Sequence, residues 1–310
     1  MASGGFLFQN DLSRFLQMPV NAYLADLMPL AVFRRLIHCQ GFLYYGIHCR
    51  EAANIAESVK HNLAKYPKSC AGWMKLKAFI GIFDHYCEKL VNAHRSMQRV
   101  IDYFEKKIDM PDNSWLDHIR ASGRGALFIT GHFGAVEYLP LFLAVKGCRP
   151  SIVVRFKTAK LRNVLYEKSL HVDLELIDAD EPHVAYQALN AVKRGRLLIT
   201  LCDEFKHWRP SRNDTICIFG RSAPRDRTLD VLYRRTRSPA CFGLMQRQEG
   251  RFGLKVHPLS DGSQTISLTD AAWEVLSAYI SRCPDQWYQW KEFEVEFEAY
   301  ANRGTLYAPV

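Results

Sequence analysis

From about residue 115 onward, short apolar runs alternate with longer amphipathic segments. Each apolar run has the length and the bounding turn residues that are typical of a buried strand: 127–130, 151–154, 174–177 and 197–201. The segments between them have helical spacing: 137–145, 159–170 and 183–193. This β-α-β rhythm predicts an α/β fold with a mostly parallel central sheet flanked by helices. Further strands are expected at 216–219, 240–245 and 253–257, followed by a helix at 269–283.

The first 114 residues have a different, helical pattern. Amphipathic helices are expected at 51–65 and 73–94, and the apolar stripe of the second indicates a core-facing helix. The earlier apolar pieces are short and carry arginines, and the longest, 23–33, is interrupted by Arg34 and Arg35, so none can span a bilayer. Two interpretations fit these pieces equally: an interfacial membrane anchor, or an ordinary helical layer on the core. We therefore predict a helical region at 1–114 and an α/β region at 115–310, integrated into one domain.

Composition narrows the classes of function. The chain has 310 residues, 48% of them hydrophobic, which is enough for a sizeable core. Its net charge of +9 suits nucleic acid, an anionic membrane surface or a phosphorylated substrate. No nucleic-acid motif is present, so nucleic acid is not an expected partner. The nine cysteines are odd in number and lack C-x-x-C spacing, which disfavours a disulfide framework or a zinc site and fits a reducing compartment. No secretory signal is visible.

The main candidate site follows the strand at 127–130, where His132 and Glu137 stand near a glycine-rich turn. Ligands of open α/β sheets bind at the carboxyl ends of strands, and a histidine there can remove a proton near neutral pH. A nearby carboxylate can orient the imidazole. Because a five-residue spacing is not a helical i, i+4 pair, the pairing requires His132 to lie in the turn before the helix. The alternative is that His132 caps the helix and Glu137 interacts favourably with its dipole.

Other polar residues also follow predicted strands. Arg155 comes directly after 151–154 and suits a phosphate or carboxylate, while Asp203 and Glu204 come after 197–201 and could orient a hydroxyl or pair with arginines. Gly220 and Arg221 lie in a glycine turn that could form a pocket wall or contact a polar head group. The nucleophile elbow, the phosphate-binding loop and the dinucleotide fingerprint are all absent. A histidine–acid pair without a protein nucleophile suggests direct transfer, in which a substrate hydroxyl attacks an activated carbonyl.

These residues resemble a known family. Gly131-His132-Phe133-Gly134-Ala135-Val136-Glu137 is similar to the H-x4-D/E signature of the glycerolipid and lysophospholipid acyltransferases. The chain resembles most closely the late acyltransferases of lipid A biosynthesis, the lauroyl and myristoyl transferases. Further matches are Arg155 after a strand, Asp203 in a late loop, Phe219-Gly220 with Ala223, and the tryptophan-rich segment 285–290.

The resemblance implies a general base, His132, oriented by Glu137, with Arg155, Asp203, Gly220 and Arg221 contacting substrate. An acyl chain would pass from acyl carrier protein or acyl-CoA to a hydroxyl of a glycolipid or other lipid, with no metal or bound cofactor. The expected partners are acyl carrier protein, the lipid acceptor and the anionic inner-membrane surface. The expected location is the cytoplasmic face of the bacterial inner membrane, peripheral or monotopic.

The chain departs from the family at two points. Glu204 stands where the family usually has glutamine, and the N-terminal apolar pieces are interrupted where the family often has a membrane-spanning helix. The acceptor could therefore be a lysophospholipid or another glycolipid, or the transferred group could be amino-acyl. A non-catalytic basic membrane-binding protein and a hydrolase are the alternatives from other classes.

Overall fold

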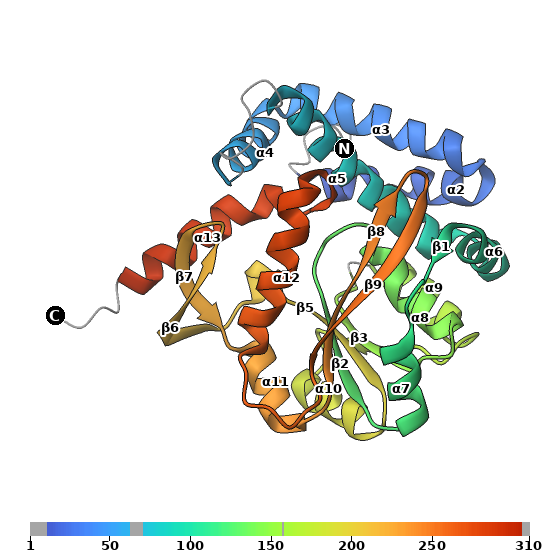
Figure 1. The fold of residues 1–310 in the computed structure, drawn as a ribbon. Coiled ribbons are helices and arrows are strands. Elements are labelled where there is room, and N and C mark those ends of the chain that lie inside the picture. The colour runs from blue at the N-terminus through green and yellow to red at the C-terminus, as the bar shows by residue number, and fades with distance from the viewer. Residues whose placement is uncertain (1–10, 63–70, 157, 306–310) are drawn as a thin grey trace.

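The computed structural model describes residues 11–62, 71–156 and 158–305. Within them, seven strands form one sheet in the order β1-β9-β8-β2-β5-β3-β4 (Figure 1). The strands of this sheet are β1 (Ile108–Asp109), β2 (Ala126–Thr130), β3 (Pro150–Val154), β4 (Glu175–Asp178), β5 (Leu197–Leu201), β8 (Ala240–Gln248) and β9 (Arg251–Ser260). All neighbouring pairs are parallel except β8 and β9. The predicted α/β fold with a mostly parallel sheet is confirmed.

Strand β2 lies at the centre of the sheet, between β8 and β5. All five of its residues are fully buried, which is why the segment is a continuous apolar run rather than an alternating one. The helices of this region are α7 (Ser114–Ser122), α8 (Leu139–Val145), α9 (Ala159–Ser169), α10 (Val184–Lys193), α11 (Thr228–Thr236), α12 (Leu268–Arg282) and α13 (Trp290–Thr305). Short 3₁₀ turns are η2 (Val136–Tyr138), η3 (Phe205–His207) and η4 (Pro284–Gln286).

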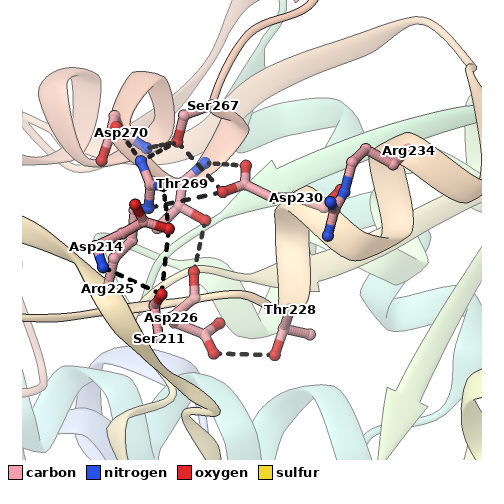
Figure 2. A network of polar contacts seen from close by, with 10 residues as sticks. All are labelled: Ser211, Asp214, Arg225, Asp226, Thr228, Asp230, Arg234, Ser267, Thr269 and Asp270. Atoms are coloured by element: carbon pink, nitrogen blue, oxygen red, sulfur yellow. Dashed lines mark hydrogen bonds and ion pairs between the residues drawn. The ribbon is translucent and has the colours of Figure 1, made fainter.

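The expected strand at 216–219 forms part of a separate hairpin. Strands β6 (Pro210–Ile218) and β7 (Arg221–Asp226) pair only with each other, antiparallel. Phe219 and Gly220 at the turn both have positive φ, 52° and 81°, as a type I′ hairpin turn requires. Figure 2 shows how Arg225 anchors this hairpin: its guanidinium lies 3.0 Å from Asp214 and 2.8 Å from Asp270 of α12.

The N-terminal region is helical, as predicted, and lies over one end of the sheet (Figure 1). Its helices are α1 (Leu12–Leu16), α2 (Pro19–Leu27), α3 (Leu30–Ile47), α4 (Cys49–Asn62), α5 (Ala71–His94) and α6 (Met97–Lys107). Helix α5 packs against α2 and α3 on one side and against η2 and η4 on the other, so it joins this layer to the sheet region. The segment before residue 114 also contributes β1, which pairs with β9.

Candidate active site

The turn after β2 depends on two glycines. A Cβ atom at Gly131 would lie 2.8 Å from the Leu276 side chain, and one at Gly134 would lie 1.9 Å from the Met245 carbonyl oxygen. Gly134 also has a φ of +62°, which disfavours other residues. The chain can therefore turn tightly here and hold His132 at the carboxyl end of β2.

Asp203 holds the His132 side chain. It follows β5, which pairs in parallel with β2 so that Thr130 lies opposite Leu201. The Asp203 carboxylate is fully buried; its Oδ1 lies 3.0 Å from His132 Nδ1, and its Oδ2 accepts hydrogen bonds from the His132 backbone N–H at 2.8 Å and from Trp287 Nε1–H at 2.8 Å. Three donors thus fix this carboxylate, and the carboxylate in turn fixes the imidazole.

These contacts determine which ring nitrogen carries the proton. A carboxylate at hydrogen-bond distance requires Nδ1–H, which leaves Nε2 of the neutral ring with a free lone pair. The Gln289 side-chain amide also lies against Nδ1, with its Nε2 at 2.9 Å, while Gln289 Oε1 is buried without a partner. A side-chain amide has the same shape with oxygen and nitrogen exchanged, and Nδ1–H favours the oxygen facing the ring. The arrangement suits proton abstraction by Nε2.

Nearby carboxylates tune the basicity of His132. Burial opposes the charged imidazolium, but Asp203, and then Glu204 and Glu137, outweigh burial and raise the pKa of His132. Glu204 Oε2 lies 3.7 Å from Nε2, and its side chain is 41% exposed, against 15% for His132. Glu204 is therefore the acid nearest to the free nitrogen, and its side chain is more exposed than that of His132.

Glu137 does not make the predicted contact with His132; within the described ranges no hydrogen bond or ion pair joins them. Its Oε1 lies 3.3 Å from His85 Nε2 and 3.5 Å from Lys89 Nζ, both on α5. The 3₁₀ turn η2 precedes α8 and directs Glu137 toward α5, so the carboxylate that contacts His132 is that of Asp203, which comes from another strand. Glu137 acts on His132 only through its charge.

Several residues of the site were missed by the sequence analysis. His85 stacks on Tyr288 with ring centroids 4.0 Å apart, and burial, followed by the charge of Lys89, lowers its pKa well below the usual range. The apolar stripe of the predicted helix 73–94 indicates a core-facing helix and does not reveal that His85 and Lys89, four residues apart, share a face. Trp287 and Gln289 lie in the tryptophan-rich segment that the resemblance had singled out, but their partners could not be inferred from sequence.

Arg155 lies at the same sheet edge as His132, two strands away, because the order is β2-β5-β3. Its Nε donates to Asp180 at 3.1 Å and its Nη1 lies 2.8 Å from His207 Nε2. The side chain is 51% exposed, so its guanidinium remains accessible.

Gly220 and Arg221 lie at the β6–β7 turn. Arg221 Nη1 donates to the Glu294 carboxylate at 2.9 Å, and its guanidinium lies 5.9 Å from the Phe293 ring centroid. Both partners belong to α13, so these contacts connect the hairpin to the C-terminal helix. The predicted substrate role of this pair stays a prediction.

No protein-family model matches the sequence, and no match is found among curated proteins.

Proposed function

We propose that this protein is an acyltransferase that moves a fatty acyl group from acyl carrier protein or acyl-CoA to a hydroxyl of a membrane lipid. The observation that carries the proposal is the buried Asp203 carboxylate bound to His132 Nδ1, with Nε2 directed away from it at the carboxyl edge of the sheet. The resemblance of the 131–137 segment to an acyltransferase signature supplies the reaction class.

In the proposed reaction, His132 Nε2 takes the proton of the acceptor hydroxyl as its oxygen attacks the thioester carbonyl carbon. The carbonyl π electrons move to oxygen and form a tetrahedral oxyanion. When the carbonyl re-forms, the C–S bond breaks with its electron pair on sulfur, and the proton on His132 passes to the thiolate. Asp203 holds the ring and stabilises the imidazolium between these steps. The products are an ester and a free thiol.

The membrane association that the proposal includes is supported by the surface of the N-terminal helices. Eight of the twelve large hydrophobic side chains that are exposed in the described part of the chain lie between residues 20 and 73: Val20, Tyr23, Leu27, Val32, Phe42, Leu43, Ile47 and Trp73. Those of α2 are three and four residues apart, so they share one helix face, and the exposed Arg35 of α3 lies three residues after Val32, on the same face of that helix. In the ranges that the structure describes, no helix is both long and apolar enough to cross a bilayer. We propose that these eight side chains, the N-terminal hydrophobic surface, bind an anionic membrane surface.

The N-terminal hydrophobic surface gives a direct prediction. Replacing both Tyr23 and Leu43 with serine is expected to weaken binding to anionic vesicles by about tenfold or more, since each loses over 1 kcal/mol of apolar burial. Co-sedimentation with phosphatidylglycerol vesicles measures the change. The matched control replaces Leu170 and Tyr186, which are also exposed, at 86% and 63%, but lie outside the N-terminal region, directly after α9 and within α10. Equal loss of binding in both double variants would contradict the proposal that the N-terminal hydrophobic surface binds the membrane.

The function itself is tested by product analysis. Purified protein is incubated with a panel of acyl carrier protein and acyl-CoA thioesters and with total bacterial lipid extract, and lipids are resolved by mass spectrometry. We expect a new acylated lipid from the wild type, and a loss of about 10²–10⁴-fold in its formation by His132→Gln. Free fatty acid as the sole product would instead indicate a hydrolase. If the wild type forms no product with any of these thioesters but still binds vesicles, the result would favour a non-catalytic membrane-binding protein.

A further inference from the structure

The carboxylate of Glu137 contacts His85 and Lys89 of α5. Its Oε1 is shared by the neutral His85 and by Lys89, and the Lys89 Nζ–Oε1 distance is 3.5 Å. Resting on the proposed acyl transfer, we propose that Lys89 is the catalytic cation that stabilises the tetrahedral oxyanion, and that Glu137 positions it. Asp203 and Glu137 then have separate tasks: Asp203 orients the base, and Glu137 orients the cation.

The Lys89 ammonium is available to a ligand. It has three N–H donors, and in the described residues the single polar contact it makes is the one to Glu137. Its side chain is 30% exposed and that of Glu137 is 24% exposed, so both reach the surface of the site. The charge of Glu137 raises the pKa of Lys89 against the opposing effect of burial, and Glu204 contributes in the same direction. Lys89 therefore stays protonated over the range in which His132 changes charge.

Lys89 and His132 are connected through Glu137 and His85. The rings of His85 and His132 lie 6.3 Å apart, and His85 Nε2 lies 3.3 Å from the Glu137 oxygen that also contacts Lys89. Glu204, whose charge acts on both Lys89 and His132, lies beside Nε2. A carbonyl oxygen that becomes negative near Nε2 is repelled by Glu204 and attracted by Lys89, which sets the orientation of the thioester.

Other cations close to the site are already engaged. Arg247 makes a two-pronged ion pair with Glu88 and is 16% exposed, and Lys291 is 12% exposed and lies 3.4 Å from the Tyr86 hydroxyl. Arg155 lies two strands from β2, which at normal strand spacing is about 10 Å. Arg155 is thus better placed for a distant anionic group of a substrate than for the reacting carbonyl.

The test compares Lys89→Met, Lys89→Arg and Glu137→Gln in the acyl-transfer assay, with Lys193→Met as the matched control. Lys193 is an exposed lysine in the last turn of α10, before the amino end of β5. We expect Lys89→Met to lower kcat by about 10²–10³-fold with little change in KM, because the oxyanion exists only in the reacting complex. Lys89→Arg is expected to recover part of that loss, and Lys193→Met to behave as the wild type.

Glu137→Gln separates positioning from catalysis. It is expected to lower kcat less than Lys89→Met does, since the ammonium remains, and to move the acid limb of the pH profile to lower pH, since Glu137 raises the pKa of His132. Where methionine lowers thermal stability, Lys89→Gln replaces it in the comparison.

An active wild type whose kcat is unchanged by Lys89→Met overturns the proposal. So does an increase in KM alone, which would assign Lys89 to a phosphate of the acceptor. An inactive wild type refutes the proposed function itself, and the role of Lys89 falls with it.

Discussion

Replacing Asp203 with asparagine is expected to lower turnover by about 10²–10⁴-fold while leaving the fold intact. The reason is the set of three donors that converge on this carboxylate: the backbone N–H of His132, its Nδ1–H, and Trp287 Nε1–H. An asparagine can satisfy the two donors that share Oδ2 only by turning its oxygen toward them. Its NH₂ group then faces Nδ1 and donates to it, so the ring proton moves to Nε2. In that tautomer Nε2 cannot accept the substrate proton.

The pH profile of Asp203→Asn gives a second readout. In the wild type the charge of Asp203 helps to raise the pKa of His132, and the base is active once it has lost its proton. Removing that charge lowers the pKa, so the acid limb of kcat/KM is expected to move to lower pH even as the maximum falls. Nitrogen NMR of labelled histidine reports the tautomer directly.

Glu204→Gln is the matched control, because it makes the same chemical change one residue further along the chain. Glu204 lies 3.7 Å from Nε2 and is partly exposed, so its loss is expected to shift the acid limb in the same direction but to reduce turnover less than tenfold. Equal losses in the two variants would contradict the assignment of Asp203 as the residue that orients the ring.

The largest effect on stability is expected at the buried ion pair between α5 and β8. Glu88 and Arg247 are 8% and 16% exposed, and both guanidinium–carboxylate distances are 2.7 Å. Removing Arg247, as in Arg247→Met, is expected to lower the free energy of unfolding by about 3–5 kcal/mol, since it leaves a buried acid without a partner. Burial raises the pKa of Glu88 and Arg247 opposes that rise, so the unpaired acid becomes neutral in the variant.

Urea denaturation followed by circular dichroism measures this loss. The control is Arg251→Met, which removes an arginine with the same two-pronged geometry toward Asp109, at 2.7 and 2.6 Å. That pair is about half exposed on each side, so its removal is expected to lower the free energy of unfolding far less than the removal of Arg247 does. A double variant, Glu88→Met with Arg247→Met, is expected to recover stability relative to Arg247→Met. If Arg247→Met lowers the free energy of unfolding as little as Arg251→Met does, burial does not strengthen the Glu88–Arg247 ion pair.

The local patterns of the sequence were sufficient for the fold class. Strands such as β2 are short apolar runs buried on both faces, and the segments between them have helical periodicity. The alternation of strands and helices can therefore be predicted from local sequence alone. The hairpin of β6 and β7 was only partly anticipated. Its second strand, Arg221–Asp226, is rich in polar residues and is stabilised by pairing with β6. A local sequence pattern cannot predict such pairing.

The sequence by itself also placed His132 and Asp203 after strands, because residues that follow parallel strands meet at one edge of the sheet. It could not decide which acid contacts the histidine. Spacing along the chain suggested Glu137, but the adjacency of β2 and β5 brings in Asp203, and the 3₁₀ turn η2 directs Glu137 to His85 and Lys89 of α5. Hydrogen bonds depend on positions within about 3 Å, and those positions are set by how distant segments pack rather than by their order in the chain.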